Sequence, residues 1–161
     1  KRAKSNSTGI SIFKGEKLKK LLDECEIKPH VIQMEAHPYY RDEETIAALA
    51  PCGCCVMAWY PLGHGDHALL EEPVVKELAE KYGKSTAQVI LRWHTQVGNI
   101  VIPGSTNPEH IKVNLDIFDF ELTEEEMKQM AGLNKNVRYY YPDEEKLAAY
   151  ANMKIDLDSQ K

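Results

Sequence analysis

The chain has 161 residues, of which 43% are hydrophobic and 28% charged, and its net charge is −5. This length corresponds to one domain with a sizeable core, and the acidic balance argues against a nucleic-acid partner, since the lysine-rich stretch at 14–20 is interpreted as the solvated face of a helix. No apolar run approaches the ~20 residues of a membrane span, and the polar start at 1–9 does not resemble a signal peptide.

The first part of the chain alternates short strands with helices. A β-prone run at 8–12 precedes a helix at 14–26, in which apolar side chains recur at helical spacing. A second strand is predicted at 31–35. It is followed by a helix at 42–50, for which Asp42 is the predicted N-cap.

The middle of the chain continues this alternation. The segment 54–60 is apolar throughout, which predicts a third strand that is covered on both faces, as in a parallel sheet. The segment 61–67 is expected to be a loop. Two helices are then predicted at 73–81 and 85–96, and the second opens with a capping-box pattern.

The last part of the chain completes the pattern and ends in a polar tail. A fourth strand at 99–103 leads through a tight loop into a helix with Asn107 at its N-cap. Another helix is predicted at 123–133, and the tail at 137–161 has a weak helical pattern around 144–150. Four strands that are each followed by a helix predict an α/β fold whose parallel (β/α) units form half of a TIM-type (β/α)8 barrel.

The loop after the fourth strand is a candidate anion site on physical grounds alone. Gly104, Ser105 and Thr106 are small residues that precede the start of a helix. Free backbone N–H groups and nearby hydroxyls at a helix N-terminus favour a phosphate. The competing interpretation is a well-capped helix that binds nothing.

Four motifs at the ends of the predicted strands share a family resemblance. In chain order they read GISIF at 9–13, VIQMEAHPY at 31–39, AWYPLG at 58–63 and IPGSTNPEHI at 102–111. Over residues 7–135 the sequence resembles strands five to eight of the aldo-keto reductases. This implies that 1–135 is the C-terminal half of such a barrel and 136–161 a tail, with the site at the carboxyl ends of the strands.

The resemblance implies three residues that hold a nicotinamide. Ser11 and Gln33 would bind the carboxamide, for which a Gln amide offers both a donor and an acceptor. Trp59 would stack under the ring with its flat apolar face. Ile12 stands where the family has Asn, so one hydrogen bond is missing. The competing interpretations are a polar Gln33 that satisfies barrel backbone and a Trp59 that belongs to the core.

The resemblance also implies residues around the pyrophosphate. Leu62 and Gly63 match the loop that crosses the pyrophosphate, and Tyr60 replaces a residue that is often Ser in the family. We expect the bulkier phenol ring to reshape this loop.

The adenosine end of the cofactor would lie near the last strand. The family loop that meets the 2′-phosphate corresponds to Gly104, Ser105 and Thr106, and Asn114 corresponds to a residue that contacts the adenine. Gly104 is often Lys in the family, and His110 is often Arg. Because a phosphate monoester favours a charged donor, we expect poor preference for NADPH, so that the cofactor is NADPH or NADH.

The resemblance does not extend to a catalytic centre. The family uses an Asp–Tyr–Lys–His tetrad on its first four strands, which this sequence lacks, so we assign no catalytic residue.

The chain starts at Lys1 rather than Met, and we expect it to be part of a longer cytoplasmic NAD(P)H-dependent reductase of small aldehydes and ketones, inactive as an isolated fragment. The alternatives are a stand-alone half-barrel that binds nucleotide or self-associates through its open sheet edges, and a structural protein without chemistry.

Two further groups of residues each have two interpretations. Cysteines at 52–55 and histidines at 64–67 suit zinc by residue type, but their spacing is not that of a structural zinc site, which favours reduced thiols and loop histidines. The tyrosines at 139–141 lie where the family's C-terminal loop often lines the substrate pocket. Surface packing is the other interpretation of these tyrosines.

Overall fold

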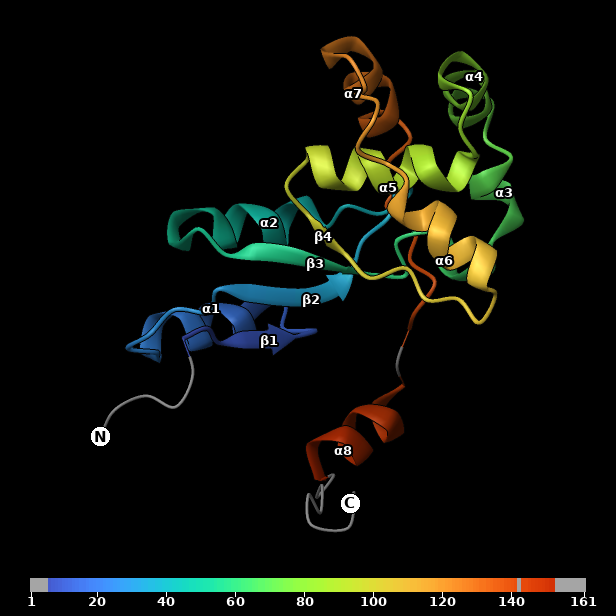
Figure 1. Cartoon of the computed structure of the whole chain (residues 1–161). Helices are drawn as coiled ribbons and strands as arrows, with labels where there is room; N and C mark the ends of the chain where they lie inside the picture. The colour runs from blue at the N-terminus through green and yellow to red at the C-terminus, as the bar shows by residue number, and fades with distance from the viewer. Residues whose placement is uncertain (1–5, 142, 153–161) are drawn as a thin grey trace.

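The computed structural model describes residues 6–141 and 143–152. Its centre is one four-stranded parallel sheet in the order β1-β2-β3-β4, so each strand pairs with the next one along the chain (Figure 1). The strands are β1 (Gly9–Ser11), β2 (Val31–Glu35), β3 (Cys55–Trp59) and β4 (Ile100–Val101). The predicted parallel α/β architecture is therefore confirmed, although β4 is shorter than the expected run at 99–103.

The helices follow the strands as the sequence predicts. They are α1 (Gly15–Glu24), α2 (Glu43–Leu49), α3 (His67–Leu70), α4 (Pro73–Tyr82), α5 (Thr86–Gln96), α6 (Pro108–Leu115), α7 (Glu124–Ala131) and α8 (Glu144–Asn152). Asp42 caps α2 by accepting the Thr45 N–H, and the capping box of α5 is present. The short α3 lies at the end of the segment expected to be a loop, and Asp66 caps it.

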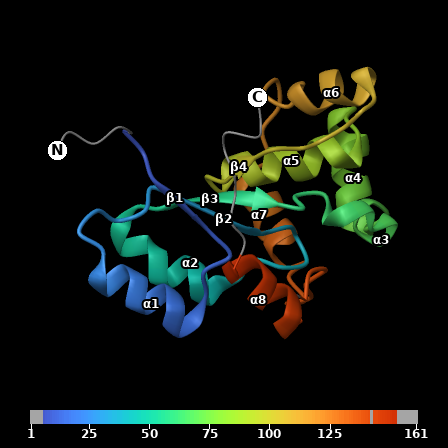
Figure 2. The ribbon, with the colours of Figure 1, turned by 90° about the horizontal axis from the view of Figure 1, so that it is seen from below.

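One face of the sheet is covered by α1 and α2. Alternate strand residues such as Ile32, Met34 and Ala58 pack there against Leu18 of α1 and Leu49 of α2, and all five are buried. Figure 2 shows the two helices next to each other on this side. The 3.6-residue and 2-residue periodicities of the helices and strands place their apolar residues in this layer.

The opposite face of the sheet is open within the described residues. Ser11, Gln33 and Met57 lie in one row across the strands, because they are partners in the register, and none of them is buried. The prediction that the third strand is covered on both faces is therefore wrong: Cys55 is exposed and Trp59 is half-buried. Both faces of β3 are apolar, but the described chain places a helical layer against only one of them.

A second core holds α4, α5 and α7 together. Residues of α4, α5 and α7, including Val75, Ile90, Trp93 and Met130, form one buried apolar cluster, and Figure 1 shows these helices gathered on the same side of the sheet. None of the helices in the described part of the chain combines the length and the apolar character that crossing a bilayer requires.

Candidate functional site

A pocket lies at the carboxyl ends of the first three strands. It has a volume of about 260 Å³, and its lining consists of Ser11, Ile12, Gln33, Trp59 and Tyr140. Ser11 ends β1, Gln33 pairs with it in β2, and Trp59 ends β3. The structure thus brings together the three side chains that the resemblance assigns to the nicotinamide.

The amide of Gln33 keeps most of its hydrogen-bonding capacity. Among the described residues its one hydrogen bond runs from Nε2 to the Met57 Sδ, at 3.6 Å, and a thioether sulfur is a weak acceptor. Next to it, Ile12 has a φ of 59°, so the backbone turns sharply directly after Ser11. The amide oxygen and an N–H of Gln33 are available to a ligand in the pocket.

Three stacked rings follow the end of β3. The centroids of the Trp59 and Tyr60 rings lie 4.0 Å apart, with an interplanar angle of 23°. The centroids of the Tyr60 and His64 rings lie 3.9 Å apart, with an interplanar angle of 28°. Tyr60 and His64 both have positive φ, at 56° and 54°, a conformation that is uncommon outside glycine and clusters at functional sites. One face of the Trp59 ring is therefore stacked on Tyr60, so only its other face is open to a nicotinamide ring.

A second pocket adjoins the first and shares Trp59 with it. Its volume is about 420 Å³, and its lining includes Tyr60, Leu62 and Gly104. Gly63 does not line it. A Cβ at that glycine would lie 2.9 Å from the Leu69 side chain, so Gly63 serves close packing of the loop.

The other residues assigned to the adenosine end lie outside both pockets. Ser105 Oγ accepts the Asn107 N–H at 3.1 Å, which together with the side-chain cap of Asn107 confirms the predicted N-cap of α6. Two N–H groups at this helix start are therefore paired within the chain. Thr106 and His110 are exposed, and Asn114 is half-buried.

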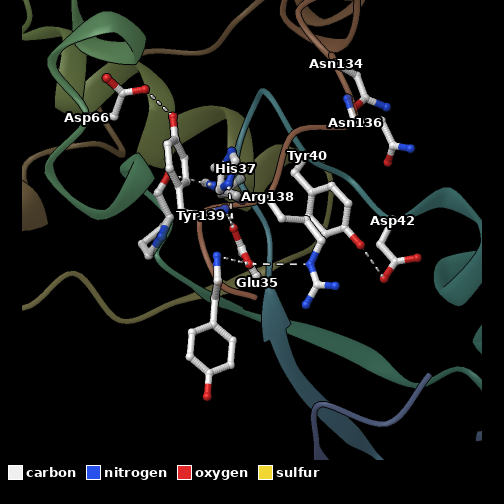
Figure 3. Close-up of polar contacts among 12 residues, drawn as sticks. Glu35, His37, Tyr40, Asp42, Asp66, Asn134, Asn136, Arg138 and Tyr139 are labelled. Atoms are coloured by element: carbon white, nitrogen blue, oxygen red, sulfur yellow. Dashed lines mark hydrogen bonds and ion pairs between the residues drawn. The ribbon is translucent and has the colours of Figure 1, made fainter. Parts of the chain in front are cut away.

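A buried carboxylate beside the site was not anticipated from the sequence. Glu35 ends β2 and is only 3% exposed. It accepts the backbone N–H groups of Tyr139 and Tyr140, and its Oε1 lies 3.2 Å from the buried His37 Nε2. Figure 3 shows His37 and Tyr139 beside Glu35. A glutamate within a run of strand residues was the signal that could have identified it, because a charge in that place requires partners.

The tyrosines with shifted pKa values are poor proton donors. Burial, together with a nearby carboxylate, raises the pKa of four of them above the ordinary value: Tyr39, Tyr40, Tyr82 and Tyr139. A catalytic acid at neutral pH needs the opposite shift.

The cysteine and histidine segments do not converge on a metal site. Residues 6–141 and 143–152 contain no group of three or more His, Cys, Asp or Glu side chains arranged to hold a metal ion. Burial raises the pKa of the Cys54 thiol to about 11, so this thiol stays protonated at neutral pH.

Solved structures share this architecture over about half of their length. An aldo/keto reductase from Brucella melitensis is 41% identical with a TM-score of 0.73, over 80% of this chain and 48% of that chain. The Bombyx mori aldo-keto reductase, solved in complex with NADP, is 36% identical with a TM-score of 0.74, over 82% of this chain and 46% of that chain.

The sequence comparisons agree with the structural ones. Aldo-keto reductase family 1 member A1 of Gallus gallus is 44% identical over 146 residues, which is 86% of this chain and 45% of that protein. The chain thus spans less than half the length of this relative. The model of the Aldo/keto reductase family matches residues 4–135. The chain therefore belongs to the aldo-keto reductase family.

Proposed function

We propose that this chain provides the nicotinamide-dinucleotide platform of a cytoplasmic oxidoreductase that reduces small aldehydes and ketones to alcohols with NADPH or NADH. The observation that carries the proposal is the convergence of Ser11, Gln33 and Trp59 on one pocket. The NADP complex of the similar Bombyx mori enzyme supports the choice of cofactor. The unpaired state of all four cysteines supports the compartment.

The donor set of the pocket fits a nicotinamide. The free donor and acceptor of the Gln33 amide match a carboxamide, and the Ser11 hydroxyl adds a second polar contact. Trp59 contributes a flat apolar wall. A bound reduced nicotinamide would supply the hydride, and the role of these residues is to fix which face of the ring meets the carbonyl.

The proposal assigns binding, but no proton transfer, to this chain. Reduction of a carbonyl requires an acid that protonates the developing oxyanion, whereas Tyr40 and Tyr139 have raised pKa values because they are buried beside carboxylates. We therefore propose that residues 1–135 are the cofactor half of a barrel and 136–161 its tail, and that the isolated chain is inactive.

Titration of the purified chain with NADPH tests the proposal. Gln33→Leu preserves the size of the side chain but removes its donor and acceptor, so we expect the Kd, measured by cofactor fluorescence, to rise about 10- to 100-fold. Gln129→Leu makes the same chemical change on the exposed surface of α7 and should leave the Kd unchanged. An unchanged Kd in Gln33→Leu, or no fluorescence response of the wild-type chain, would contradict the proposal.

The residue at position 104 should decide between the two cofactors. Gly104 is exposed, and nothing lies within 4 Å of a Cβ built there, so a lysine fits without strain. Because a charge-assisted hydrogen bond to a phosphate contributes about 1.5–3 kcal/mol, Gly104→Lys should raise the preference for NADPH over NADH at least about tenfold. The ratio of the two Kd values measures this. An unchanged ratio would place the 2′-phosphate elsewhere.

Self-association is a second candidate function, which the open edge of the sheet favours. β4 has no further strand beside it in the described chain, Ile100 is 39% exposed, and α6 contains no buried residue, with Leu115 74% exposed. Such an edge is a template for pairing with a second copy. Sedimentation velocity that shows only monomer would exclude this candidate.

A further inference from the structure

The segment 135–141, which leads from the barrel half into the tail and is called the tail segment, is tied to the loop after β2 by backbone hydrogen bonds. The N–H groups of Lys135 and Val137 both donate to the Tyr39 carbonyl, at 3.1 Å. The next two contacts are with a side chain, because the N–H groups of Tyr139 and Tyr140 donate to the two carboxylate oxygens of Glu35. One glutamate thus holds two successive amides of the tail segment 135–141.

The hydrogen-bond partners of Glu35 keep its carboxylate charged. Burial alone would raise its pKa, but the hydrogen bonds from His37 and from the Tyr139 N–H outweigh burial and hold the pKa below its usual range. The Arg138 Nε lies 3.8 Å from the same carboxylate, and Figure 3 shows His37, Arg138 and Tyr139 around it. A buried carboxylate that accepts backbone N–H groups makes strong, charge-assisted hydrogen bonds.

The tail side chains continue this attachment across the strand ends. The centroid of the Tyr139 ring lies 4.7 Å from that of the His37 ring, and the Tyr139 hydroxyl donates to Asp66 in the loop after β3. The Tyr140 ring meets Trp59 edge-on, with ring centroids 4.9 Å apart and an angle of 76°. Tyr140 is thereby one of the five residues that line the pocket with Gln33 and Trp59.

We infer that Glu35 is a positioning residue of the candidate cofactor site: its carboxylate anchors the tail segment so that Tyr140 forms one wall of the pocket. The pocket retains a volume of about 260 Å³ with Tyr140 in this place, so the ring bounds the space and does not fill it. That this wall serves a nicotinamide rests on the function proposed above. The anchoring of the tail by Glu35 does not depend on it.

The variant Glu35→Gln tests the anchor with little change in shape. A Gln side chain can accept only through its one oxygen, and its amide group opposes the second N–H of the tail. We expect hydrogen exchange at Tyr139 and Tyr140 to become at least about tenfold faster, because charge-assisted hydrogen bonds are lost. Acrylamide quenching of Trp59 should rise. The other tryptophan, Trp93, is 1% exposed and contributes little to quenching.

A matched control is the second buried carboxylate, Glu126. It is 7% exposed, accepts from the Tyr82 hydroxyl of α4 at 2.6 Å, and accepts from the N–H of Thr123, the N-cap of its own helix α7, at 2.7 Å. Glu126→Gln should loosen those helices but leave the exchange rates of the tail amides and the quenching of Trp59 at their wild-type values. A general loss of stability would affect both variants alike.

Tyr140→Leu separates the wall from the anchor. It removes the ring but keeps the backbone N–H that Glu35 accepts. In contrast to Glu35→Gln, we expect the tail amides to stay protected. As in Glu35→Gln, the quenching of Trp59 should increase and the NADPH Kd should rise about tenfold. Unchanged tail exchange in Glu35→Gln would overturn the anchor, and unchanged quenching in both variants would overturn the wall. If wild-type protein does not bind NADPH, the proposed function fails, while exchange and quenching still decide the role of Glu35.

Discussion

Replacement of Trp93 by alanine is expected to lower the free energy of unfolding by about 3–5 kcal/mol. Trp93 is 1% exposed and lies in the apolar cluster formed by α4, α5 and α7. Loss of the indole would leave a cavity that the surrounding helices can close only in part. Urea unfolding followed by circular dichroism measures the loss, and a chain of marginal stability would already be partly unfolded without denaturant.

The conservative variant Trp93→Phe is the control for this loss. The indole Nε1 has no hydrogen-bond partner among the described residues, so phenylalanine gives up volume but no hydrogen bond. We expect it to cost clearly less than alanine, about 1–2 kcal/mol. Equal losses in the two variants would show that packing around the ring is not the cause.

Acid should destabilise the chain through His94 before most carboxylates are protonated. Complete burial lowers the pKa of His94 to about 3, whereas the unfolded chain has its ordinary value near 6.5. Between these two pKa values, His94 is therefore protonated in the unfolded chain and neutral in the folded chain. The stability contributed by neutral His94 is complete above pH ~6.5 and is lost as the pH falls toward ~3, a loss on the order of 5 kcal/mol in total.

Burial keeps the His94 ring neutral, and the two hydrogen bonds of the ring fit that neutral form. Nε2 lies 3.2 Å from the Pro61 carbonyl, and Nδ1 lies 3.1 Å from the Asn99 Nδ2. This pairing suits a tautomer in which Nε2 donates and Nδ1 accepts. Protonation would place a second donor opposite the Asn99 amide group at a fully buried ring.

Urea unfolding at pH 7.0 and pH 4.5 measures the effect. Between these values we expect the wild-type chain to lose about 2–3 kcal/mol more than His94→Gln, which does not titrate. Carboxylates with lowered pKa values, such as Glu126, destabilise both proteins equally in acid. Parallel pH profiles for the two proteins would contradict a neutral buried His94.

The sequence could predict only those site residues that lie at or near strand ends. Ser11, Gln33 and Trp59 each stand at or near the end of an apolar run, and the parallel order places those ends together. The wall formed by Tyr140 could not be predicted in this way. Its partner Glu35 is 105 residues distant in the chain, and no local pattern links the two.

Features that act over a few residues were determined by the sequence itself. The capping box at Ser85 and the caps at Asp42 and Asn107 form as predicted, because a cap satisfies N–H groups two or three residues away. The alternation of strands and helices follows from the same short-range periodicities. Family membership was also readable in motifs at the strand ends.

Tertiary structure alone decided which faces are buried and what closes the pocket. The apolar run that forms β3 leaves Trp59 half-open, whereas the charged Glu35 is buried. Hydropathy describes a side chain, but burial depends on which distant segment packs against it. The tail segment 135–141 supplies two backbone N–H groups that make burial of Glu35 possible, and that pairing exists only in the folded chain.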